Sequence, residues 1–169
     1  MSKFEQMWNN FPKKEVIKVA CTNKQKDSNK PFSDYCAIML SECFIRSGIS
    51  ISAFKAKRCW SHKGEKHILL AEELANALNT SRPASFQPMK KISPSEFQSE
   101  ISGKTGVIFF KDYWSRGKES FESRSGDHID LWNKDKITSS GMVMRSIYEF
   151  FGVVSDLNKS KEVWFWEVK

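Results

Sequence analysis

The fold of this chain is organised around one stretch, Ser33-Asp34-Tyr35-Cys36-Ala37-Ile38-Met39-Leu40-Ser41. Ser33 and Asp34 are short polar residues, whose side chains accept hydrogen bonds from the free N–H groups at the start of a helix. An apolar pattern with helical spacing follows, and it stops at Gly48, a residue type common just after a helix ends. The sequence therefore predicts a helix from about Cys36 to Ser47, with Cys36 in its first turn.

A cysteine at a helix start has a chemical consequence. The helix dipole stabilises an anion there, so we expect the thiolate of Cys36 to form more easily than that of an ordinary cysteine. Such a thiolate is a nucleophile when a histidine takes the thiol proton. The alternative is a buried and inert thiol, because free cysteines are often core residues. Cys43 lies on the apolar face of the same helix, and we interpret it as a buried core residue of this inert kind.

The best candidate for that histidine is His128, in Gly126-Asp127-His128-Ile129-Asp130-Leu131-Trp132-Asn133. Polar and apolar residues alternate here, which predicts a strand. His128, Asp130 and Trp132 then share one face, and the two aliphatic residues between them share the other. We interpret the cysteine and the histidine as the nucleophile and general base of a papain-like cysteine hydrolase.

A third group must orient the imidazole of such a pair. Asp130 leaves the predicted strand on the same face as His128, so its carboxylate can reach the far imidazole nitrogen and fix the tautomer. A turn follows, and the chain returns near Ser139, roughly opposite these two residues. Asp130 is our predicted orienting residue, Ser139 is the alternative, and backbone N–H groups at the helix start, including that of Cys36, are candidate oxyanion donors.

Length and composition favour one ordinary globular domain spanning residues 1–169. Hydrophobic residues make up 40% and charged residues 28% of the 169 residues, which suits a single sizeable core. No apolar run of about 18 residues occurs, so no membrane insertion is expected. The first residues lack the apolar segment of a signal peptide. We expect a protein that stays in the cytoplasm or leaves it by a route that reads no such peptide.

The formal net charge of +7 favours polyanionic partners in general. Lysine and arginine are nevertheless spread along the chain and do not alternate with aromatic residues on one element. We therefore predict a solvated basic surface and no nucleic-acid partner. A non-catalytic basic module that binds nucleic acid or an anionic polymer remains an alternative, and salt-sensitive binding that survives Cys36→Ala would reveal it.

The four cysteines are Cys21, Cys36, Cys43 and Cys59. No CxxC pair occurs among them, so neither a zinc site nor a thioredoxin motif is expected. We accordingly predict no metal and no other cofactor. Whether Cys21 and Cys59 meet in the folded chain is left open.

The remaining elements frame these two motifs. Expected before the Cys36 helix are a helix that ends at Pro12 and a polar loop over residues 22–32. Expected after it are a helix from Glu65 to Leu78 with His67 on its surface, a helix from Ser93 to Gly103, a strand over residues 106–110, a polar loop over 112–127, a helix from Met142 to Phe151 and a strand from Glu162 to Val168. Helices followed by a meander of strands predict an α+β domain, with N-terminal helices packed on an antiparallel sheet.

At these motifs the chain resembles a known family. Cys36-Ala37-Ile38-Met39-Leu40-Ser41 resembles the Cys-Pro/Ala-Ile-Arg-Met-Ser motif of type VI secretion amidase effectors, family four, and residues 126–133 resemble their Gly-His-x-x-Leu-Trp-Asn motif. Residues 103–108 and 163–166 add weaker matches. The resemblance covers about residues 33–169, and the two motifs together are fairly specific.

The resemblance implies a papain-like NlpC/P60 fold and an antibacterial toxin. Such effectors cut the peptidoglycan stem peptide between γ-D-glutamate and meso-diaminopimelate. They are injected by the type VI secretion apparatus into a rival's periplasm, and a cognate immunity protein protects the producer. Carried over by motif, Cys36 is the nucleophile and His128 the base. The chain departs from the pattern at Met39, where the family often has arginine, and at Ser139, where some members have the orienting aspartate.

Three aromatic residues are candidates for substrate binding, namely Tyr35, Trp60 and Trp114. A different reaction on the same dyad, a cysteine transferase or a deamidase acting on a protein, is the second enzymatic alternative. The products formed from peptidoglycan would separate these alternatives from the wall amidase.

Overall fold

The computed structural model describes residues 1–25, 28–115, 118–120, 122–123, 125–138 and 158–169. Its elements, in chain order, are α1 (Lys3–Asn10), α2 (Lys14–Ala20), β1 (Asn23–Gln25), β2 (Ser28–Lys30), α3 (Cys36–Arg46), α4 (Ala71–Thr80), β3 (Lys90–Ile92), α5 (Phe97–Glu100), β4 (Thr105–Trp114), β5 (Gly126–Asn133), β6 (Lys136–Ile137) and β7 (Glu162–Glu167). In this part of the chain, no helix has the length and apolar character that crossing a membrane requires.

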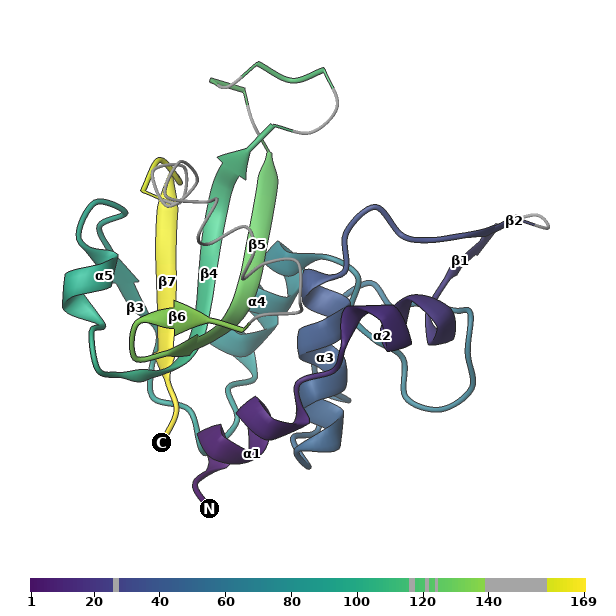
Figure 1. Cartoon of the computed structure of the whole chain (residues 1–169), viewed down its shortest axis with the longest axis horizontal. Helices are drawn as coiled ribbons and strands as arrows, with labels where there is room; N and C mark the ends of the chain where they lie inside the picture. The colour runs from purple at the N-terminus through teal and green to yellow at the C-terminus, as the bar shows by residue number, and fades with distance from the viewer. Residues whose placement is uncertain (26–27, 116–117, 121, 124, 139–157) are drawn as a thin grey trace.

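A five-stranded antiparallel sheet forms the centre of the molecule. Its strand order is β3-β7-β4-β5-β6, so β4 lies between β7 and β5 (Figure 1). Phe109 in the middle of β4 is paired with Ile129 on one side and Trp164 on the other. The two ends of the chain also meet, because the Lys3 N–H donates to the Lys169 carbonyl at 3.0 Å. The predicted α+β fold, with helices packed on an antiparallel sheet, is confirmed.

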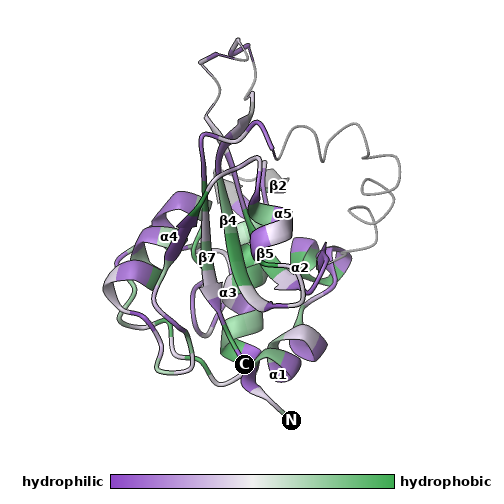
Figure 2. Ribbon diagram, turned by 90° about the vertical axis from the view of Figure 1, so that its left-hand side faces the viewer, coloured by the Kyte–Doolittle hydropathy of each residue, from purple (hydrophilic) through white to green (hydrophobic). Residues whose placement is uncertain are grey.

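The central strands are buried on both faces of the sheet. Along β4, Val107 and Phe109 join the core formed with α1, α3 and α4, whereas Ile108 and Phe110 join the core formed with α5. This assignment follows from the alternation of side chains along a strand. Figure 2 shows the hydrophobic residues concentrated along the central strands and α3. The sheet therefore has an apolar layer on each face. Helix α3 packs against β5.

Helix α3 has the bounds that the sequence predicted to within one residue. Its apolar face is fully buried at Leu40, Cys43 and Phe44, as the helical spacing predicted. The helix ends at Arg46, and Gly48 follows in the left-handed region with a φ of 69°. Glycine adopts this conformation without the steric cost that a Cβ atom brings.

The segment before α3 holds more structure than the sequence predicted. Pro12 does end the first helix, but a second helix, α2, follows at once, and its Ile17 is buried. The polar stretch expected to be a loop includes the short antiparallel strands β1 and β2. Four of the seven residues of α2 are apolar, but only Ile17 is buried and the two valines are exposed, so they make no apolar stripe of the kind that predicts a helix.

The predicted helix from Glu65 to Leu78 is wrong over its first turns, because α4 begins only at Ala71. Ile68 instead forms an antiparallel bridge with Arg58, and Leu69 donates its N–H to the Lys57 carbonyl at 3.0 Å. His67, predicted to lie on the surface, is 3% exposed. Pairing with the 57–59 segment overrides the helical pattern here and turns the histidine inward.

The remaining elements follow the prediction with shifted bounds. The helix expected from Ser93 is the short α5, and the expected strand over residues 106–110 continues to Trp114. Strand β7 matches the prediction, and so does the turn after Asn133 into β6. The helix expected from Met142 to Phe151 lies outside the described residues.

Candidate active site

Cys36 is the first residue of α3 and is half-buried. The Asp34 side chain accepts a hydrogen bond from the Cys36 N–H at 3.1 Å, as predicted for the polar residues before this helix. Tyr35 occupies the N-cap position and makes no capping hydrogen bond with its side chain. Local chemistry therefore sets where the helix starts, and it places the sulfur at the end of α3 that meets the sheet.

His128 lies on β5, at a part of that strand that β6 does not cover. Strand β6 pairs with Trp132 and Asn133, and Thr138 continues this pairing by donating its N–H to the Leu131 carbonyl at 3.1 Å. The Cys36 thiol lies close enough to the His128 side chain and to the backbone N–H of Ile129 to interact with both, and both interactions favour the thiolate by lowering the pKa of the thiol. Two segments far apart in the sequence thus bring a thiol and an imidazole into contact.

Asp130 completes a line of three groups. Its Oδ2 lies 3.2 Å from the His128 Nε2, as expected for residues two apart on one face of a strand. Because Nε2 faces the carboxylate, Nδ1 is the imidazole nitrogen left for the thiol of Cys36. Asp130 is 4% exposed, so solvent competes little for this hydrogen bond.

The second oxygen of Asp130 is held by the chain around it. Its Oδ1 accepts the Leu131 N–H at 2.7 Å and a hydrogen bond from the hydroxyl of Thr138. The sequence analysis missed Thr138, although the expected return of the chain opposite β5 was a signal for a polar residue at this place. Ser139, the alternative orienting residue, lies outside the described residues.

The electrostatics of the pair differ from the sequence expectation in one respect. Burial, followed by the charge of Asp34, raises the pKa of the Cys36 thiol, although the interaction with His128 acts in the opposite direction. The expected lowering of this pKa by the helix start is therefore wrong. The sequence could not reveal how far packing removes the sulfur from water, and desolvation disfavours the thiolate.

The pKa of the imidazole is raised as well. Burial alone would lower the pKa of His128, but the interactions with Tyr113, Asp130 and Cys36 outweigh it, so this pKa lies well above its ordinary value. The Tyr113 ring packs edge-on against His128, with centroids 6.1 Å apart. Tyr113 was also missed by the sequence analysis. A raised pKa makes the imidazole a stronger acceptor for the thiol proton.

The three aromatic residues proposed to bind substrate have different positions. Tyr35 is 2% exposed, and its hydroxyl donates to the Cys21 carbonyl at 2.9 Å, so it has a place in the core beside the helix start. Trp60 is 42% exposed and packs edge-on against Phe32. Trp114 ends β4, and its side chain lies outside the described atoms.

A helix that starts at a cysteine and packs against an antiparallel sheet bearing a histidine is the architecture of the papain-like cysteine hydrolases. The fold and the meeting of Cys36 with His128 point to this class. Within it, the chain belongs to the Tae4 family, described as type VI secretion system (T6SS) amidase effector protein 4, whose profile matches residues 32–166.

Solved structures of Tae4 proteins share this fold. Tae4 in the Salmonella typhimurium effector–immunity system Tae4/Tai4 is 17% identical, with 100% of this chain and 99% of that chain covered and a TM-score of 0.66. Tae4 from Enterobacter cloacae is 20% identical, with 100% and 98% covered and a TM-score of 0.59. No curated protein sequence matches the chain. The N-terminal segment before the family match is thus part of the shared fold.

Proposed function

We propose that this amidase effector hydrolyses the γ-D-glutamyl–meso-diaminopimelate amide of peptidoglycan stem peptides, with Cys36 as nucleophile, His128 as general base and Asp130 as the residue that orients the imidazole. The single observation that carries this proposal is the contact of the Cys36 thiol with the His128 imidazole, backed by Asp130 on the Nε2 side. Membership in an amidase effector family supports the reaction type.

The geometry allows a balanced two-step reaction. The Cys36 sulfur attacks the amide carbon while its proton passes to His128, and a tetrahedral oxyanion forms. The C–N bond then breaks as His128 returns that proton to the departing amine, which leaves a thioester on the sulfur. Water attacks the thioester, His128 takes one of its protons, and release of the carboxylic acid restores the thiol.

The oxyanion needs donors at the helix start. The Cys36 N–H, our expected donor, is engaged by Asp34 in the described structure. We propose that substrate binding moves the Asp34 side chain off this N–H, because a carboxylate and an oxyanion cannot share it favourably. This movement would also lower the pKa of the Cys36 thiol, because the charge of Asp34 contributes to its rise.

A T6SS effector is delivered into a target cell, and we place the action of this one in the periplasm, where stem peptides are exposed. The partners that follow are the secretion apparatus and a cognate immunity protein. The solved relatives include Tae4 from Enterobacter cloacae in an effector–immunity complex with Tai4, which is 20% identical over 100% of this chain and 99% of that chain, with a TM-score of 0.58.

The test is digestion of purified peptidoglycan, followed by mass spectrometry of the muropeptides. The wild-type protein should release fragments that end at γ-D-glutamate, and one heavy oxygen from labelled water should appear in the new carboxylate. Cys36→Ala should give none of these fragments, whereas Cys43→Ser, a change in a buried cysteine of the same helix, should retain cleavage. An unchanged muropeptide profile with folded wild-type protein would refute the proposal.

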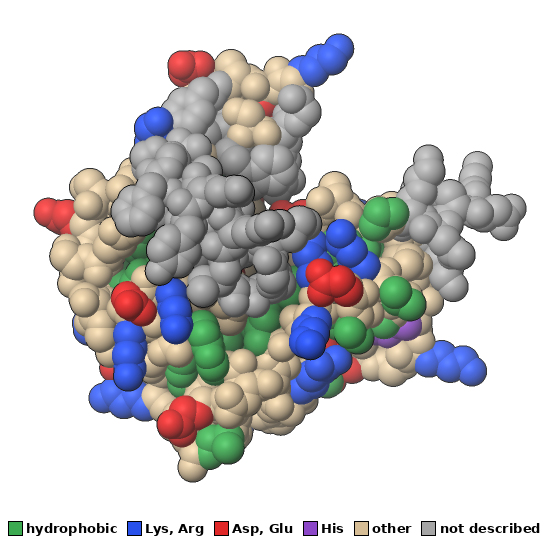
Figure 3. All heavy atoms as spheres, in the orientation of Figure 1, with side chains coloured by type: hydrophobic (Ala, Val, Ile, Leu, Met, Phe, Trp, Pro, Cys, Tyr) green, Lys and Arg blue, Asp and Glu red, His purple; other side chains and the backbone are tan. Residues whose placement is uncertain are grey.

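The same experiment separates the alternatives. A transferase would leave an amine adduct in place of the heavy oxygen, and a polymer-binding module would bind peptidoglycan in a salt-sensitive way that survives Cys36→Ala. On the face seen in Figure 3, basic side chains occupy several separate places with acidic ones between them. The described part of this face therefore offers a binding module no continuous basic surface.

A further inference from the structure

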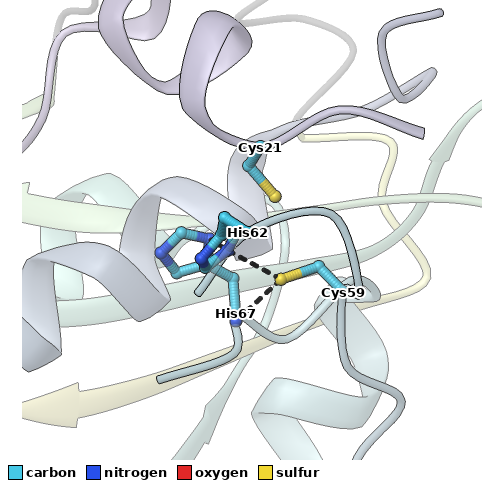
Figure 4. Close-up of side chains that lie close together, drawn as sticks. All are labelled: Cys21, Cys59, His62 and His67. Carbon is cyan, nitrogen blue, oxygen red and sulfur yellow. Dashed lines mark hydrogen bonds between the residues drawn. The ribbon is translucent and has the colours of Figure 1, made fainter. Parts of the chain in front are cut away.

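Four side chains away from the Cys36–His128 contact converge on one point. The sulfurs of Cys21 and Cys59 and one ring nitrogen each of His62 and His67 all lie within 4.8 Å of one another (Figure 4). Cys21 comes from the end of α2, and the other three come from the segment between α3 and α4. Two thiols and two imidazoles are the donor set of structural zinc sites.

The backbone already holds two of these residues in place. Cys59 and His67 lie opposite each other beside the Arg58–Ile68 bridge. The Cys59 N–H donates to the His67 carbonyl at 2.9 Å, and the His67 N–H donates to the Cys59 sulfur at 3.1 Å. A backbone N–H that donates to a cysteine sulfur stabilises its thiolate form, the form that binds metals. These two hydrogen bonds fix the position of the Cys59 sulfur relative to His67.

The hydrogen bonds of the two histidines fix which nitrogen faces the cluster. The Nδ1 of His62 lies 2.9 Å from the Lys63 carbonyl oxygen, and the Nε2 of His67 lies 2.8 Å from Glu42 Oε2. Both oxygens can only accept, so these two nitrogens carry the hydrogens. In neutral rings the opposite nitrogens, the Nε2 of His62 and the Nδ1 of His67, then present lone pairs toward the cluster.

Those two nitrogens lie 3.2 Å apart, with no hydrogen between them in the neutral rings. The Cys59 sulfur lies 3.0 Å from the same Nε2 of His62. A cation at the centre removes this repulsion between lone pairs, and two adjacent sulfurs make a soft metal ion a better occupant than a proton. The outer contacts also match a metal site, because ligating histidines usually donate their other N–H to a carboxylate or a carbonyl.

We propose that Cys21, Cys59, His62 and His67 bind one Zn²⁺ ion in a closed, tetrahedral structural site. Bond lengths of about 2.3 Å to sulfur and about 2.0 Å to nitrogen put tetrahedral ligands roughly 3.3–3.8 Å apart. The pairs at 3.0 and 3.2 Å then need a small expansion, and any pair near the 4.8 Å limit needs a contraction of about 1 Å. Binding displaces the protons that the four ligands carry in the metal-free protein. This proposal replaces the expectation of no metal, which rested on the missing CxxC pair. The spacing Cys59-Trp60-Ser61-His62 was the available signal.

The ion would connect three parts of the molecule. Cys21 anchors the end of α2, His62 and His67 anchor the loop before α4, and Glu42 links the site to α3. Tyr35, immediately before the nucleophile candidate, donates its hydroxyl to the Cys21 carbonyl. Zinc in this position would hold the start of α3 in place, and it would do so whatever reaction Cys36 performs.

The experiment measures metal binding on the full chain, purified with reductant and supplied with Zn²⁺ or Co²⁺. Elemental analysis should find one equivalent of zinc per chain, and the cobalt form should show the intense visible absorption of tetrahedral coordination. Denaturation with chelator should expose all four thiols. Cys36→Ser, outside the cluster, should bind zinc like the wild type, whereas Cys59→Ser should lose it.

Two milder variants keep the test decisive if Cys59→Ser fails to fold. His62 is half-buried in a loop, so His62→Gln should fold and still bind zinc much more weakly in competition with a coloured chelator. Glu42→Gln, which weakens the support of His67 and otherwise affects the i,i+4 pair of Glu42 with Arg46, should weaken zinc binding by about 10–100-fold. Absence of tetrahedral cobalt absorption in the wild type, or a Cys21–Cys59 disulfide formed in the presence of zinc, would overturn the proposal.

Discussion

Thr138 donates its hydroxyl hydrogen bond to Asp130 on the carboxylate oxygen that does not face His128. The threonine thereby fixes the rotation of the carboxylate, and the carboxylate in turn fixes the imidazole ring. Support of this kind comes from a residue outside the reacting groups, and it determines how well the reacting groups are aligned.

Removal of that support should reduce both stability and activity. Thr138→Val keeps the shape of the side chain and removes the donor, at an expected cost of about 1–2 kcal/mol in the free energy of unfolding, measured with urea. Activity on peptidoglycan should fall severalfold. In an Asp130→Asn background the same change should cost less activity, because the two residues act through one contact. Equal losses in both backgrounds would contradict this role.

The pH dependence of activity should reveal the carboxylate. His128 must be neutral to accept the thiol proton, and its pKa lies well above its ordinary value, so kcat/KM should keep rising as the pH increases beyond about 6.5. Asp130→Asn removes a charge that favours the imidazolium, so the acid limb should move to lower pH. The maximal rate should fall roughly 10²–10⁴-fold.

The matched control for that change is Asp135→Asn, in the exposed turn after β5. Its pH profile should follow that of the wild type on a γ-glutamyl-diaminopimelate peptide. An acid limb that stays in place in Asp130→Asn would show that the carboxylate does not set the imidazole pKa.

The charge of Asp34 should restrain the thiol. Asp34→Asn retains an oxygen that can accept the Cys36 N–H but removes a charge that raises the pKa of the sulfur. The rate of Cys36 alkylation by iodoacetamide at neutral pH should therefore rise, by up to about tenfold for a lowering of one pKa unit. Cys36→Ser measures the background from the other three cysteines. A slower or unchanged rate would count against this effect of the charge.

Gly106 is required for packing within the sheet. A Cβ atom at this position would lie 2.1 Å from the Trp166 carbonyl oxygen and 2.9 Å from the Phe165 ring, so Gly106→Ala should lower the free energy of unfolding by about 3 kcal/mol or more. Gly48→Ala is the control. A Cβ atom there meets no other atom within 4 Å, so only the positive φ should lower the free energy of unfolding, by about 1 kcal/mol. Urea midpoints that rank the two in the opposite order would contradict this explanation.

The elements that the sequence predicted well are those specified by local chemistry. The Cys36 helix has polar residues before it, a helical apolar face and Gly48 after it, and each signal acts within a few residues. Strand β5 follows from strict alternation, which also places His128 and Asp130 on one face. The family match over residues 32–166 agrees with the two motifs recognised in the sequence.

The predictions that failed depend on contacts between distant segments. His67 was expected on a helix surface, but pairing of its segment with residues 57–59 buries it. The thiol pKa of Cys36 was expected to be lowered by the helix start, but packing of α3 against β5 removes the sulfur from water. The partners of Cys21 could not be inferred either, because nothing near it in the sequence indicates Cys59.

The sequence by itself thus determined the helix that begins at Cys36, the strand that carries His128 and Asp130, and the α+β class. Hydrogen-bonding residues at helix ends and the two side-chain periodicities are local, so a reader of the sequence can use them. Only the tertiary structure decided that the thiol meets the imidazole beside β5, and that Cys21 joins the Cys59–His67 segment. Such meetings depend on how separate elements pack, and sequence spacing does not encode that geometry.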